Sequence, residues 1–144
     1  MSMFKAIIAI GGGVFAAFCK SYGLIIELVA IAIVFDFTTG LIRGKIKGDI
    51  NSKKGFKGFL KKIALLLSLF FGIFLDSFIP LLLILGLNIK IPFDLPFSLI
   101  IGSYIILNES ISITENLYEC GVKLPTFIVK LLKVAGEQLD SDKK

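Results

Sequence analysis

The stretch Asp36–Ile63, "DFTTGLIRGKIKGDINSKKGFKGFLKKI", separates two long apolar segments and decides the class of this chain. It opens with an acid at the end of an apolar run and then collects basic residues. Between positions 43 and 62 it carries a net charge of +7, against +5 for the whole chain, because eight basic residues face one acid, Asp49; the basic residues are Arg43, Lys45, Lys47, Lys53, Lys54, Lys57, Lys61 and Lys62. A short basic segment between apolar runs is the strongest orientation signal in a membrane protein. We therefore expect residues 43–62 to form a cytoplasmic loop that rests on anionic lipid.

The composition of the rest of the chain supports a membrane class. Of the 144 residues, 56% are hydrophobic, 14 are Phe and none is His. Soluble domains average about 45–50% apolar residues. Without histidine, a Ser–His or Cys–His catalytic pair is excluded. The two cysteines, Cys19 and Cys120, form no metal or redox motif. We therefore expect an integral membrane protein that is not an enzyme, has no cofactor or metal, and does not bind nucleic acid.

The apolar runs predict an all-α integral membrane protein with about three transmembrane helices in one domain, residues 1–144. The expected spans are residues 22–42, 63–85 and 97–118. Pro80 is expected to kink or end the second span. In residues 125–139 the charged side chains Lys130, Lys133 and Glu137 share one helical face and apolar residues occupy the rest. This pattern is typical of an amphipathic helix in the membrane interface.

The N-terminal segment, residues 4–19, is apolar, short and rich in glycine. It is expected to form an interfacial or re-entrant helix, with a cleaved signal peptide and a fourth crossing as alternatives. Small residues at Gly12 and Ala16 would let another helix approach closely. With the basic loop inside, the third span returns the chain to the cytoplasm.

Polar residues inside the spans need partners or water, because ionised groups cost about 2.5–3.5 kcal/mol each on insertion scales. Asp36 is expected to pair with Arg43 or with a lysine of the basic loop. Two polar stripes stand out further along, Ser68–Gly72–Asp76 and Asn108–Ser112–Glu115–Glu119. They are either solvated at the interfaces or form helix–helix seams, some of which face water in an oligomer. An intramembrane aspartyl protease is disfavoured because Asp36 and Asp76 lie at different depths.

Two blocks of these residues resemble the signature of the toxin-secretion/phage-lysis holin family, of the phage holin family 4 type. The first block is an acid before Thr-Gly, then Ser-x-x-Gly-x-x-Gly-x-x-x-Lys, matched by Asp36, Thr39, Gly40, Ser52, Gly55, Gly58 and Lys62. The second is Asn-Glu-x-x-Ser-x-x-Glu-Asn followed by Gly and Pro, matched by Asn108, Glu109, Ser112, Glu115, Asn116, Gly121 and Pro125. These residues and Asp76 are the candidates for helix packing or pore lining.

The resemblance implies a small phage protein of the bacterial cytoplasmic membrane that self-associates and opens that membrane at a set time. The lesion would depolarise the cell and release a cell-wall hydrolase (endolysin), or export a toxin. The implied partners are further copies of the chain, anionic lipid and an antiholin, with the endolysin or toxin as passenger. An antiholin on the same scaffold and a small ion channel remain the alternatives.

Overall fold

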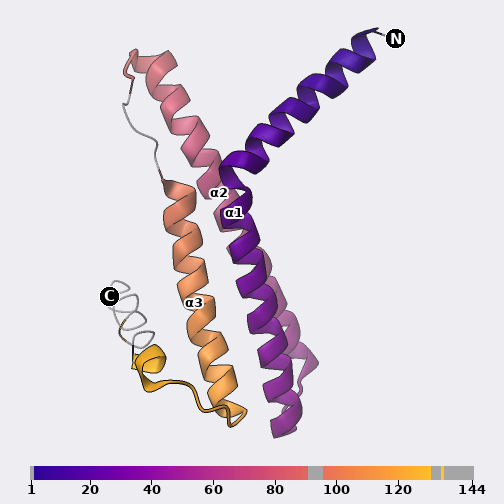
Figure 1. Ribbon diagram of the computed structural model, residues 1–144, viewed down its shortest axis with the longest axis vertical. Coiled ribbons are helices and arrows are strands. Elements are labelled where there is room, and N and C mark those ends of the chain that lie inside the picture. The colour runs from indigo at the N-terminus through magenta and orange to yellow at the C-terminus, as the bar shows by residue number, and fades with distance from the viewer. Residues whose placement is uncertain (1, 91–95, 131–133, 135–144) are drawn as a thin grey trace.

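The computed structural model describes residues 2–90, 96–130 and 134, and they form an all-helical structure (Figure 1). Three long helices follow one another, α1 (Ser2–Lys47), α2 (Ser52–Leu87) and α3 (Phe97–Glu119). Each is long and apolar enough to cross a membrane. Helix α3 packs along both others, whereas α1 and α2 touch each other little. The predicted fold class is confirmed.

Helix α1 is far longer than the span expected for it. Its 46 residues correspond to about 69 Å at 1.5 Å per residue, more than twice the hydrocarbon thickness of about 30 Å. Residues 4–19, expected as a separate interfacial segment, are the first part of this helix. Figure 1 shows that this part bends away from the bundle formed by the rest of the chain.

Most of the basic stretch 43–62 is helical, since its first residues continue α1 to Lys47 and its last begin α2 at Ser52. The connection between α1 and α2 spans only residues 48–51, where Gly48 has a φ of 67° and ends α1. Asn51 caps α2, because its side-chain oxygen accepts a hydrogen bond from the Lys53 backbone N–H at 2.9 Å. Ser52 of the first sequence block is the first residue of the helix.

Helix α2 continues through Pro80 and ends before Asn88, which has a φ of 53°. Helix α3 ends before Gly121, with a φ of 85°, and residues 126–130 begin a short further helix. The rest of the expected interfacial helix, apart from residue 134, lies outside the described residues.

The core lies where α3 meets the other two helices. Its buried side chains are Val29, Leu69, Ile73 and Ile105. Two glycines let the helices come this close. A Cβ at Gly102 would lie 2.5 Å from Ile25 Cγ1, and one at Gly72 would lie 3.1 Å from the Cα of Ser98. Because one of these neighbours is backbone, a larger residue at position 72 would push α2 and α3 apart.

Candidate functional site

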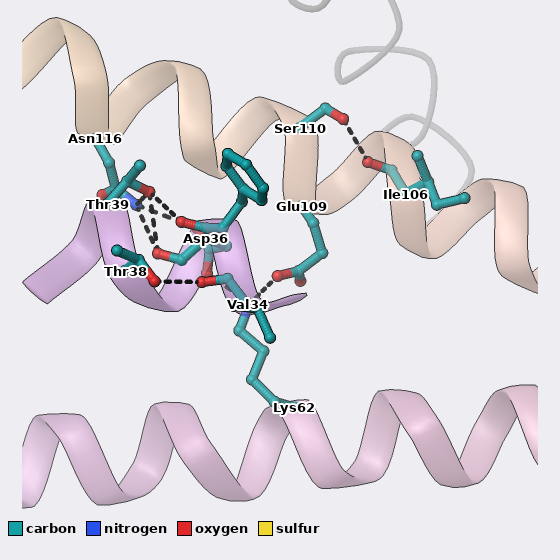
Figure 2. Close-up of polar contacts among 10 residues, drawn as sticks. Val34, Asp36, Thr38, Thr39, Lys62, Ile106, Glu109, Ser110 and Asn116 are labelled. Atoms are coloured by element: carbon teal, nitrogen blue, oxygen red, sulfur yellow. Dashed lines mark hydrogen bonds and ion pairs between the residues drawn. The ribbon is translucent and has the colours of Figure 1, made fainter. Parts of the chain in front are cut away.

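A polar network joins the three helices in the half of the bundle near the α1–α2 connection (Figure 2). Lys62 of α2 is its centre. The ammonium group forms an ion pair with Asp36 Oδ2 of α1 at 2.6 Å and another with Glu109 of α3. The Lys62, Asp36 and Glu109 side chains are only 15, 11 and 2% exposed. Buried charges are costly unless they are paired and hydrogen-bonded, and here one cation serves two acids.

Asn116 extends the network along α1. Its side-chain nitrogen donates to Asp36 Oδ1 at 3.1 Å and to the Thr39 hydroxyl at 3.2 Å. The Thr39 hydroxyl in turn donates to the Phe35 carbonyl one turn earlier, at 2.9 Å. Among the described residues every buried side-chain nitrogen or oxygen has a hydrogen-bond partner. The network is therefore satisfied, which is the condition under which buried polar groups specify one arrangement of helices.

The sequence prediction that Asp36 pairs with Arg43 or a lysine of the basic stretch is confirmed, with Lys62 as the lysine. Arg43 instead lies 3.9 Å from Glu119 Oε1, and Lys47 also pairs with Glu119. Since α1 and α3 both end here, this second cluster of charges holds their ends together. Its side chains are 38–47% exposed, so each contact contributes little to stability.

A groove of about 410 Å³ opens beside the network, between α1 and α2. Its lining includes Gly40, Ser52, Gly55, Gly58, Lys62, Ser112 and Asn116, all of them residues of the two sequence blocks. No atom lies within 4 Å of a Cβ placed at Gly55 or Gly58. These two glycines therefore pack against nothing within the described part of a single chain. A Cβ at Gly40 would meet only the Asn116 side chain, at 3.6 Å.

Asp76 lies apart from the network and caps α3 from the side of α2. Its Oδ1 accepts the Phe97 backbone N–H at 2.7 Å, and its Oδ2 accepts the Ser98 N–H at 3.2 Å and the Ser98 hydroxyl at 2.5 Å. The first N–H groups of a helix have no partner within it, and in an apolar environment each must find one. Nothing in the sequence had identified Ser98 as the partner of Asp76, although its place after Pro96 is typical of a helix start.

The remaining candidates lie outside these contacts. Glu115 is exposed, and Asn108 and Ser112 are half-buried. Gly121 and Pro125 mark the chain's exit from α3, and the side chains of Lys45, Lys53, Lys57 and Lys61 are exposed. Within the described ranges, no group of three His, Cys, Asp or Glu side chains could hold a metal ion, and both cysteines are free.

Comparisons with known proteins agree with the two sequence blocks. A family model described as the bacteriophage holin family matches residues 13–137. An uncharacterized protein of Listeria monocytogenes serovar 1/2a is 29% identical, covering 92% of this chain and 86% of its own length. Another, from Listeria innocua serovar 6a, is 31% identical over 85% of this chain and 79% of its own. No solved structure matches the chain significantly.

Proposed function

This chain belongs to the bacteriophage holin family, whose members are non-enzymatic membrane proteins, and we propose that it opens the host cytoplasmic membrane during lysis. In this proposal the protein accumulates in that membrane, self-associates, and forms a lesion that depolarises the cell. The lesion then lets an endolysin reach the cell wall, or exports a toxin. The observation that carries the proposal is that residues of the two sequence blocks, 47 to 80 positions apart in the chain, meet in one polar network between three membrane-length helices.

The network supports a role in assembly because it holds the helices together without an extensive apolar core. Only four hydrophobic residues of the described ranges are fully or nearly buried, whereas long apolar side chains cover the outside of all three helices. Such a unit is stable in lipid, where the outward apolar faces need no protein cover. The open groove beside Lys62 and the exposed Glu115 supply polar surface that a neighbouring copy or water would meet in an oligomer.

The charges of the basic stretch support an orientation with this end of the bundle in the cytoplasm. The ends of α1 and α3 meet here through Glu119, and α2 starts here. Lysines near anionic lipid contribute about 1 kcal/mol each to membrane binding.

A cysteine introduced at Lys53 should therefore resist a membrane-impermeant thiol reagent in intact cells, whereas one at Asn88 should react. Labelling at position 53 from outside would contradict this orientation.

The lysis function is tested by inducing this chain alone in bacteria. Membrane potential, culture density and leakage of a cytoplasmic enzyme are followed together. We expect a delay after induction, followed by abrupt loss of the membrane potential. When an endolysin is supplied as well, the cytoplasmic enzyme should leak from the cells. An antiholin would insert without killing cells and would delay lysis by a co-expressed holin. A small ion channel would depolarise cells without passage of any protein.

A further inference from the structure

The buried network around Lys62 does not balance its charges. Lys62 brings one positive charge, whereas Asp36 and Glu109 bring two negative charges when both are ionised. Both acids contact the same ammonium group (Figure 2), so the two carboxylates also lie close to each other. Water does little to screen their repulsion, because these side chains are only 11 and 2% exposed. The fully ionised network would therefore carry one uncompensated negative charge inside the bundle.

No second cation completes the balance within the described part of the chain. Asn116 and Thr39, the other members of the network, are neutral. Lys61, the next charged residue near Glu109, is exposed. Arg43 lies 3.9 Å from Glu119, at the end of the bundle. An isolated charge is so costly in apolar surroundings that an acid takes up a proton instead of remaining ionised.

The groove beside the network gives this proton a route from one end of the bundle. Asp36 and Lys62 line it where it meets the network, and residues 49–52 line it at the connection between α1 and α2. Its volume of about 410 Å³ is far larger than the roughly 10–15 Å³ that one water molecule needs. The groove therefore connects the buried network with the end of the bundle that the proposed orientation places in the cytoplasm.

We propose that the network binds one proton from the cytoplasmic side, and that this proton stabilises the packing of α1, α2 and α3. With the proton bound, one carboxylate remains and Lys62 neutralises it, so the network has no net charge. Without it, the carboxylates of α1 and α3 repel each other. The proton belongs to the pair of acids rather than to either one. The proton site is independent of the lysis function, whereas its effect on lysis timing rests on the proposed function.

The proposal fixes the sign of the pH dependence. In the unfolded chain water reaches both acids, and they are ionised above about pH 4. The folded bundle then binds one proton more than the unfolded chain, so its stability falls as the pH rises. One proton changes the equilibrium constant of unfolding about tenfold per pH unit. Two acids held only as ion pairs would have the opposite sign, because such a bundle loses stability on acidification.

Unfolding of the intact, detergent-solubilised chain over the neutral pH range tests the proton site. The wild type should show the tenfold dependence per pH unit. Glu109→Gln replaces one acid by a neutral amide of the same shape and leaves Asp36 paired with Lys62, so its unfolding should not depend on pH. Asp36→Asn should behave alike, because either amide removes the excess charge. Glu115→Gln, an exposed position of α3, is the control and should keep the wild-type dependence. A wild type without pH dependence, or a Glu109→Gln variant that retains it, would overturn the proposal.

Two further measurements separate a bound proton from other causes. Lys62→Met leaves two buried acids and no cation, so the network should bind two protons and its pH dependence should become about a hundredfold per pH unit. In reconstituted membranes at neutral pH, the infrared band of a protonated carboxyl group should appear in the wild type and be absent from Glu109→Gln. If stability instead followed the concentration of Na⁺ or K⁺ at fixed pH and ionic strength, a metal cation and not a proton would occupy the site.

Lysis timing in cells links the proton site to the proposed function. A membrane-permeant weak base raises the cytoplasmic pH, and it should shorten the time to depolarisation in cells that express the wild type. Glu109→Gln should depolarise cells at a time that the base does not change. If unfolding depends on pH but the wild type never depolarises cells, the proposed function fails and the proton site stands. If cells lyse while unfolding and timing are both independent of pH, only the proton site is wrong.

Discussion

The two ends of the bundle are held by different forces. Near the basic stretch, α1, α2 and α3 are joined by a buried network around Lys62 and by ion pairs to Glu119. At the other end, α1 and α2 diverge (Figure 1), and Asp76 of α2 provides a polar cap for α3. One end thus fixes how the helices of a single chain associate. The other leaves apolar helix surfaces available for lipid or for neighbouring copies.

The largest expected effect comes from removing the cation at the centre of the network. Lys62→Met leaves Asp36 and Glu109 buried without their partner. Breaking a buried ion pair typically costs about 3–5 kcal/mol, so the variant should unfold much more readily in detergent and fail to lyse cells. Lys61→Met is the control, because Lys61 is exposed one position away. The measurement is the free energy of unfolding, from denaturant titration of the detergent-solubilised protein.

A second variant separates the loss of the cation from simple disruption. Replacing Lys62 and Glu109 together by Met removes one of the two acids that the single change leaves unpaired, so it should recover part of the lost stability although Asp36 still lacks its cation. If Lys62→Met and Lys61→Met destabilise equally, the network does not hold the helices together and the difference between the two ends disappears.

The cap at the opposite end should matter less. Asp76→Ala leaves the N–H groups of Phe97 and Ser98 without their acceptor, and loss of an N-cap costs about 0.5–2 kcal/mol. The variant should lower the free energy of unfolding by that amount, with Asp76→Asn intermediate. Ser77→Ala is the neighbouring control, since the Ser77 hydroxyl donates a hydrogen bond within its own helix, to the Ile73 carbonyl. A loss as large as that of Lys62→Met would mean that both ends are equally decisive.

The sequence predicted the helical class because apolar runs of membrane length are a direct consequence of lipid as solvent. It also predicted a basic partner for Asp36, since an acid inside a span needs one. Distances between helices cannot be read from the sequence, so there was no reason to choose Lys62, at the far end of the basic stretch, over the nearer Arg43 as the partner of Asp36. The cap by Asp76 was missed for the same reason, because Ser98 is 22 residues away and belongs to another helix. The continuity of α1 was missed because residues 4–19 are too short to cross a membrane by themselves and were expected to form a separate helix.

The smallest effect is expected where the basic end meets water. Glu119→Gln removes the acid that pairs with Lys47 and Arg43 at the ends of α1 and α3. These side chains are partly solvated, and exposed ion pairs contribute little because water and salt screen them. The unfolding midpoint should fall slightly at low ionic strength and match the wild type at about 1 M salt, where the Debye length is only about 3 Å. Lys62→Met should lose stability at both ionic strengths, because its partners are buried. If Glu119→Gln remained destabilised at high salt, the end of α3 would be held by a buried interaction. The ion pairs of Glu119 and the buried network around Lys62 would then act as one structural unit.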